Sequence, residues 1–160
     1  MFENKKTLLI KLIFLISIFA LLSAFFIEYA LGHQPCNLCI LERLPYLLAI
    51  IIILINYKFN HFEKYFIFLI AIIFLAGAIL SLYHLGIELG IVEESLLCNV
   101  KNGSNLLSKE EILKQLQEKN ISCKDVTFKI FGLSLTSYNI LISLIITFSA
   151  TKIYLNYEKN

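Results

Sequence analysis

Four cysteines are the residues in this chain best suited to chemistry. Cys36 and Cys39 form a C-x-x-C motif, and Cys98 and Cys123 lie further along the chain. Thiols in such pairs serve as exchanging disulfides, structural crosslinks or zinc ligands. A crosslink is plausible for the second pair, which closes a long loop. It is a poor explanation for the C-x-x-C motif, because closing so small a ring removes little chain entropy.

A zinc site built from all four thiols is also a poor fit to this sequence. It would take one pair from the edge of an apolar segment and the other from a distant loop. The hydrophilic spacer typical of such sites is missing. We therefore expect no metal here, and thiol–disulfide exchange is the better interpretation of the C-x-x-C motif.

The residues around the motif favour a reactive thiol. Pro35 lacks an N–H group and suits the first position of a helix, so we expect a helix to begin at or just before Cys36. The positive end of the helix dipole then favours thiolate. Arg43 follows Cys39 by four residues, which places it one turn deeper on the same helical face. We expect it to be a fixed cation beside that thiolate and its electron acceptor, with snorkelling to lipid headgroups as the alternative. Glu42 is expected at most to pair with Arg43.

His84 lies near the end of a long apolar run. Ionisable side chains within membrane spans are functional candidates. A structural histidine close to the membrane interface is the alternative.

These residues are set among segments suited to lipid. The chain is 58% hydrophobic and 16% charged, with a mean hydropathy of +0.76 and a net charge of only +2. This composition favours a membrane protein and argues against a nucleic-acid partner. Spans long enough to cross a bilayer are expected at approximately 8–30, 39–57, 65–87 and 130–151. The sequence therefore predicts an all-α membrane protein, a four-transmembrane-helix bundle in a single domain. The first run exceeds a signal-peptide core, so we expect it to remain as a span.

Lysines indicate the orientation of the bundle. The loop at approximately 31–38 has no Lys or Arg, whereas lysines flank the opposite ends of the spans: Lys5, Lys6, Lys11, Lys58, Lys64, Lys152 and Lys159. By the positive-inside rule both termini are cytoplasmic, and the loops at 31–38 and 88–129 lie outside. Within the long second loop, Ser108 and Glu111 form a capping box that predicts a short amphipathic helix.

The segment Pro35 to Arg43, P-C-N-L-C-I-L-E-R, resembles the P-C-x-x-C-x-x-E-R signature of the DsbB family of disulfide bond formation proteins. The four-span layout, the cysteine pair in the second outer loop and Gly132-Leu133-Ser134 before the last span are also similar to that family. The resemblance covers nearly the whole chain. It implies a multi-pass protein of the bacterial inner membrane that sustains disulfide formation in the periplasm.

The resemblance also implies a role for each cysteine. Cys98 and Cys123 would form a disulfide that a reduced, periplasmic, thioredoxin-fold DsbA-like partner attacks at Cys98. Cys123 would then exchange with Cys36, and Cys39 would pass electrons to a membrane quinone. The quinone would be ubiquinone or menaquinone, held beside Arg43. Apart from the resemblance, the position of His84 in its span makes it a candidate proton acceptor or quinone contact. The chain has no Trp, so its choice of partner and its contacts with the quinone are expected to differ from the family pattern.

Two other kinds of membrane protein are alternatives to this interpretation. A four-span scaffold protein with a disulfide-stapled outer loop would leave Cys36, Cys39 and Arg43 without a role. The vitamin K epoxide reductase type is also a quinone-linked four-helix protein. In that type the loop cysteines precede the C-x-x-C motif, whereas here they follow it.

Overall fold

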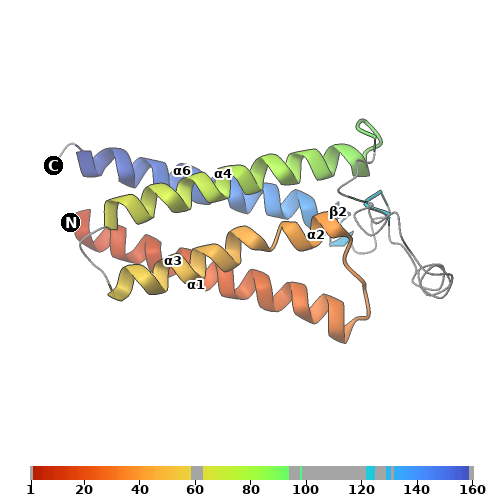
Figure 1. The fold of residues 1–160 in the computed structure, drawn as a ribbon, viewed down its shortest axis with the longest axis horizontal. Coiled ribbons are helices and arrows are strands. Elements are labelled where there is room, and N and C mark those ends of the chain that lie inside the picture. The colour runs from red at the N-terminus through yellow and green to blue at the C-terminus, as the bar shows by residue number, and fades with distance from the viewer. Residues whose placement is uncertain are drawn as a thin grey trace, which may run out of the picture.

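The computed structural model describes residues 2–58, 63–93, 98, 122–124, 129–130 and 132–158. Its long helices lie side by side, with both chain termini at one end of the bundle and α2 and β2 at the other (Figure 1). In chain order the elements are α1 (Phe2–Phe25), the π-helical turn η1 (Phe26–Ala30), α2 (Asn37–Leu41), α3 (Leu44–Lys58), α4 (Glu63–Glu88), β1 (Lys129–Ile130), β2 (Leu133–Ser134) and α6 (Leu135–Glu158).

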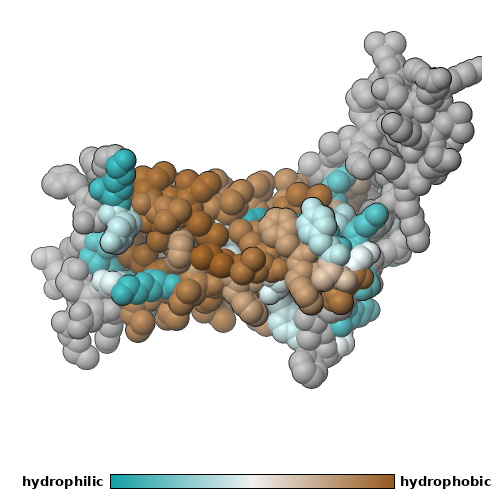
Figure 2. All heavy atoms as spheres, turned by 90° about the horizontal axis from the view of Figure 1, so that it is seen from below, coloured by the Kyte–Doolittle hydropathy of each residue, from teal (hydrophilic) through white to brown (hydrophobic). Residues whose placement is uncertain are grey.

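Four helical segments within the described residues are long and apolar enough to cross a membrane: Lys6–Ala30, Asn37–Lys58, Glu63–Glu88 and Leu135–Asn156. On the face shown in Figure 2, an apolar belt covers the middle of the bundle, and hydrophilic side chains gather toward its two ends. Large apolar side chains such as Phe19 and Phe148 point outward, as they do in proteins solvated by lipid. The predicted class, an all-α four-helix membrane protein, is confirmed.

The segment before the last helix differs from the expected span. The sequence placed that span from about residue 130, but α6 begins at Leu135. Before it, β1 and β2 form a short antiparallel hairpin in which Lys129 pairs with Ser134. Gly132 has a φ of +81°, a backbone conformation that glycine adopts without a steric penalty, and this permits the tight turn. The amphipathic helix expected near Ser108 lies outside the described residues.

Small side chains allow the helices to approach closely. The most extensive pairing joins α4 to α6, and Ser81, Ser143 and Ala150 are all buried. Between helices in lipid, close packing of small residues replaces the hydrophobic effect as the source of attraction. The central core is apolar, and Tyr46 of α3 meets Phe74 of α4 edge to face, with 5.4 Å between ring centroids.

Gly77 marks the tightest approach of α4 to α3. A Cβ atom placed there would lie 2.8 Å from Cγ of Pro45, and the proline ring cannot swing away. We expect Gly77→Ala to lower the stability of the bundle by about 1 kcal/mol, because overpacking of about 1–3 kcal/mol outweighs the gain in helix propensity. Thermal unfolding in detergent would measure this. Adding Pro45→Ala removes the clashing ring, so the double variant should recover part of the loss. Strict additivity of the two losses would contradict the proposed contact.

Candidate active site

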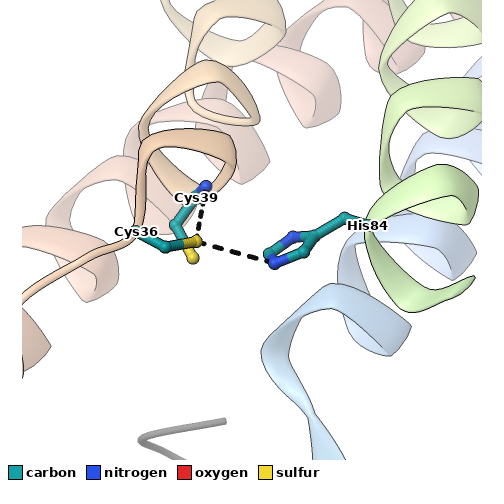
Figure 3. A group of neighbouring side chains, drawn as sticks. All are labelled: Cys36, Cys39 and His84. Carbon is teal, nitrogen blue, oxygen red and sulfur yellow. Dashed lines mark hydrogen bonds between the residues drawn. The ribbon is translucent and has the colours of Figure 1, made fainter. Parts of the chain in front are cut away.

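Cys36 and Cys39 lie at the start of α2, at the end of the bundle away from the termini (Figures 1 and 3). Cys36 is the N-cap of this helix, and its Sγ accepts a hydrogen bond of 3.2 Å from the backbone N–H of Cys39. The expectation that Pro35 occupies the first helical position is therefore wrong, because the extended backbone of Cys36 separates it from the helix. The thiol itself satisfies a backbone donor that would otherwise be unpaired.

His84 reaches the motif from α4. Its Nε2 lies 3.6 Å from the Sγ of Cys36 (Figure 3), and the side chain is only 1% exposed. On the opposite side of the ring, Nδ1 lies 2.8 Å from Oε1 of Glu42. An imidazole held in this way by a carboxylate is oriented, with its other nitrogen directed at the thiol.

The environment of Cys36 favours its thiolate. The hydrogen bond from the Cys39 side chain is the largest influence, and burial opposes it. His84 then contributes through a hydrogen bond and through charge, so that the pKa of Cys36 falls from its usual value to about 5. A low thiol pKa is the property that reactive cysteines share.

Glu42 belongs to a buried polar network rather than to an ion pair with Arg43. Its carboxylate contacts His84 and accepts a hydrogen bond of 3.2 Å from Nδ2 of Asn139. Asn139 also donates to Oγ of Ser81 at 2.7 Å and accepts from the hydroxyl of Tyr46. The expected pairing of Glu42 is therefore wrong. The physical reason is that adjacent residues on a helix do not face each other, so Glu42 bonds side chains of α4 and α6 instead of its neighbour.

Arg43 is held by the end of the first span. Its Nη1 lies 2.6 Å from Oε2 of Glu28, which η1 carries, and its guanidinium lies 5.4 Å from the centre of the Phe25 ring. Both ionic side chains are partly buried. An ion pair combined with a cation–π contact fixes the guanidinium in position.

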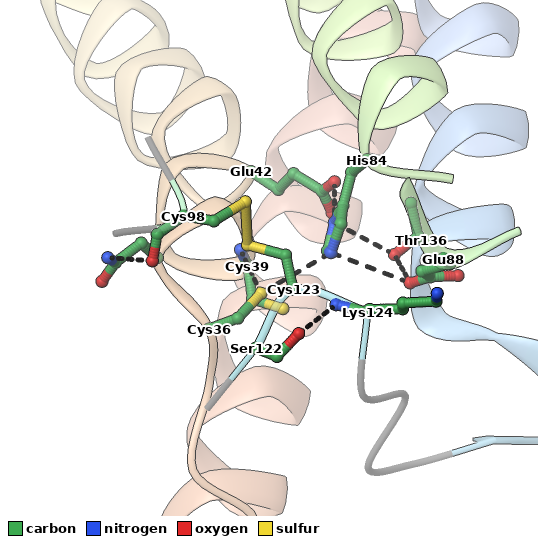
Figure 4. Close-up of a disulfide and its surroundings, with 11 residues drawn as sticks. Cys36, Cys39, Glu42, His84, Glu88, Cys98, Ser122, Cys123, Lys124 and Thr136 are labelled. Atoms are coloured by element: carbon green, nitrogen blue, oxygen red, sulfur yellow. Dashed lines mark hydrogen bonds and ion pairs between the residues drawn. A yellow bond between two sulfur atoms is a disulfide. The ribbon is translucent and has the colours of Figure 1, made fainter. Parts of the chain in front are cut away.

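Glu88 and Thr136 complete the surroundings of His84 (Figure 4). The hydroxyl of Thr136 donates to Oε1 of Glu88 at 2.6 Å and lies 3.3 Å from Nδ1 of His84. Oε1 of Glu88 is 3.8 Å from Nε2 of the same ring. The histidine thus lies between two carboxylates, with Glu42 at Nδ1 and Glu88 near Nε2.

A disulfide joins Cys98 to Cys123, with 5.9 Å between their Cα atoms, whereas Cys36 and Cys39 are free thiols. The disulfide packs directly against the C-x-x-C motif, in a buried cluster that includes Cys36 (Figure 4). The side chain of Asn37 fixes this contact by donating a hydrogen bond of 3.1 Å to the carbonyl of Cys98. Two cysteine pairs that are remote in sequence therefore meet at one place.

A cavity of about 760 Å³ opens beside these thiols. Apolar side chains of α1 and α6 form much of its wall, including Phe19 and Ile142. The wall also contains ionisable side chains and thiols that can take part in chemistry: Cys36, Cys39, Glu42, Arg43, His84 and Cys123. Its size and its few polar groups on an apolar wall are typical of a small-molecule site.

Several residues of this site were missed by the sequence interpretation. They are Glu28, Glu88, Thr136 and Asn139, none of which belongs to a recognisable motif. One signal was available: an asparagine within a membrane span is costly unless another side chain bonds it.

The comparisons with known proteins agree with this geometry. Residues 6–152 match the sequence model of the family described as disulfide bond formation protein DsbB. The chain belongs to the DsbB family. It is also 39% identical over 134 residues to the uncharacterized protein RP370 of Rickettsia prowazekii (strain Madrid E), an alignment that covers 81% of this chain and 76% of that protein.

Membership of the DsbB family establishes the general activity. The protein is a multi-pass membrane protein of disulfide bond formation, with thiol–disulfide oxidoreductase chemistry. A scaffold function would leave the C-x-x-C motif without a role.

Proposed function

We propose that the protein reoxidises a periplasmic, thioredoxin-fold DsbA-like dithiol partner and passes the electrons to a membrane quinone. The observation that carries this proposal is the packing of the Cys98–Cys123 disulfide against the reduced Cys36 and Cys39, with Cys39 on the wall of the cavity. In this proposal the loop pair receives electrons from the partner protein, and the C-x-x-C pair releases them toward the membrane interior.

The relay consists of two dithiol–disulfide exchanges. A thiolate of the partner attacks Cys98, the Cys98–Cys123 bond breaks, and Cys123 leaves as a thiolate. The second partner thiolate then attacks the mixed disulfide, so the partner is oxidised and the loop pair gains two electrons. In the second exchange Cys123 attacks Cys36 of an oxidised C-x-x-C motif. The loop disulfide reforms, and Cys36 and Cys39 become thiols.

The cavity fits the head of a quinone. A flat, largely apolar ring with two carbonyl oxygens needs an apolar wall and a few hydrogen-bond donors, and the cavity offers both. Arg43 and His84 are the residues that would hold it. The guanidinium has five N–H donors, so its contact with Glu28 does not exhaust them. A bound quinone would accept the two electrons and two protons of the Cys36–Cys39 dithiol.

Quinone dependence is tested with purified protein and a reduced DsbA-like substrate. We expect partner oxidation to require added ubiquinone or menaquinone and the absorbance change of quinone reduction to follow it. The quinone with the lower KM is the acceptor. Partner oxidation at an unchanged rate without any quinone would refute this part of the proposal.

Arg43→Ala is expected to raise the apparent KM for quinone by about tenfold or more while the protein still accumulates in the membrane. A charge-assisted hydrogen bond contributes roughly 1.5–3 kcal/mol, which is the origin of this figure. The apparent KM of Arg43→Lys should lie between those of the wild type and Arg43→Ala, because lysine keeps the charge but lacks the planar set of donors. Steady-state kinetics over a range of quinone concentrations measures this. Unchanged kinetics in Arg43→Ala would reduce Arg43 to a structural anchor.

We further propose that the protein lies in the bacterial inner membrane with both termini in the cytoplasm. The lysine pattern supports this orientation, and both termini lie at the end of the bundle opposite the cysteines (Figure 1). In intact cells treated with reductant, a membrane-impermeant thiol reagent should label Cys98 and Cys123. Labelling that occurs only after the membrane is opened would contradict the orientation and, with it, the relay.

A further inference from the structure

Cys36, Cys39 and His84 form a cluster with the composition of a metal site. In the part of the chain that the structure describes, these residues bring two sulfurs and one imidazole nitrogen within 4.8 Å of one another. Cys36 and His84 are almost fully buried, and Cys39 is partly buried. The set differs from the four-thiol site considered from the sequence, since it replaces the loop cysteines with a histidine from α4.

The spacing of the cluster matches tetrahedral coordination. Zinc binds a thiolate sulfur at about 2.3 Å and an imidazole nitrogen at about 2.0–2.1 Å, which places the two ligand atoms about 3.6 Å apart at a tetrahedral angle. The Sγ of Cys36 and the Nε2 of His84 are 3.6 Å apart. The C-x-x-C motif supplies the second sulfur from the same helical turn, as it does in many zinc sites.

The residues that support His84 are also of the kind that surround a metal-bound histidine. Glu42 bonds Nδ1 at 2.8 Å, which leaves Nε2 directed at the two sulfurs. A carboxylate placed in this way fixes the tautomer of a metal-bound histidine and raises its basicity. Asn139 in turn holds Glu42 with a hydrogen bond of 3.2 Å. This support for the histidine is an observation independent of the spacing of the cluster.

We propose that the reduced protein binds a thiophilic divalent cation of the Zn²⁺ class through Cys36, Cys39 and His84, with a water from the cavity as fourth ligand. Two metal–sulfur bonds and one metal–nitrogen bond form, the remaining thiol protons are released, and no electrons are transferred. The cation and the Cys36–Cys39 disulfide exclude each other, because the metal needs both sulfurs as thiolates. The bound cation therefore withholds this pair from disulfide exchange. The proposal concerns the reduced dithiol and does not rest on the identity of the electron acceptor.

The test uses full-length, reduced protein in detergent, titrated with Co²⁺ and then with Zn²⁺. We expect one Co²⁺ per chain with a thiolate-to-cobalt charge-transfer band, and displacement of Co²⁺ by Zn²⁺. His84→Ala should weaken Zn²⁺ affinity by more than about a hundredfold, because a direct ligand is lost. Glu42→Gln should weaken it by about tenfold, the lower end of the range for outer-shell residues. His33→Ala, which removes a histidine outside the cluster, should have no effect.

Three outcomes would overturn the site. The first is the absence of a thiolate-to-cobalt band, and the second is an unchanged affinity in His84→Ala. The third is stoichiometric binding that survives oxidation of Cys36 and Cys39 in the wild-type protein. This last measurement needs no substitution, so it decides the question even if a variant fails to fold. The Cys98→Ser/Cys123→Ser variant should still bind one cation, and loss of binding there would point to a four-thiol site.

Discussion

A Cys123→Ser variant is expected to accumulate a covalent adduct between Cys98 and a thioredoxin-fold partner. The mixed disulfide between Cys98 and the partner is broken either by the second thiol of the partner or by return attack of Cys123. It therefore persists when Cys123 is serine and the partner keeps only its first cysteine. In the structure Cys123 is the loop cysteine on the cavity wall that Cys36 and Cys39 share. This placement suits it for exchange with the C-x-x-C motif and leaves Cys98 for the partner.

Non-reducing gel electrophoresis followed by mass spectrometry would identify the adduct. Before the experiment the variant must carry Cys98 as a disulfide with an exchangeable small thiol, and the partner must have its second cysteine replaced by serine. The partner thiolate then displaces the small thiol, and the mixed disulfide forms. Cys98→Ser is the matched control and should give little or no adduct. An adduct of equal yield through Cys123 in that control would reverse the assigned roles of the two loop cysteines.

Cys39→Ser is expected to abolish turnover, with a loss of about a thousandfold or more, the scale of removing a catalytic nucleophile. Serine does not form a disulfide, so the C-x-x-C motif can no longer cycle between thiols and a disulfide. The loop disulfide remains intact, so each protein molecule should still oxidise one partner molecule and then stop.

Rapid mixing with excess reduced partner separates this single event from turnover. A burst equal to the protein concentration, with no steady phase, is the expected trace. The burst also serves as the folding control, because a misfolded variant would give none. Sustained partner oxidation in the presence of quinone would show that Cys39 lies outside the relay.

Local patterns were enough to predict the helices and the kind of chemistry. Apolar runs predict membrane spans because each must satisfy its backbone within lipid, and the C-x-x-C motif needs only four consecutive residues. The contact of the Cys98–Cys123 disulfide with Cys36 is different, since it joins residues that lie far apart in the sequence. Nothing local in the sequence encodes that contact.

The polar contacts of the site were harder to predict than its thiols. Arg43 was expected beside Cys39, and both residues line the cavity, but the ion pair of Arg43 with Glu28 of η1 was not predicted. Glu42 was assigned to its sequence neighbour, whereas its partners are His84 and Asn139 on other helices. The packing of the helices determines these partners, and the sequence pattern of a single helix does not specify that packing.

The most direct measurement counts the disulfides formed in a reduced DsbA-like partner against the quinone reduced, for the wild-type protein and for two double variants. The two variants are Cys36→Ser/Cys39→Ser and Cys98→Ser/Cys123→Ser, which each remove one pair. The account predicts one partner disulfide per quinone in the wild type, because both are two-electron couples, and no quinone reduction in either variant. Partner oxidation that continues at the wild-type rate with either pair replaced would contradict the relay.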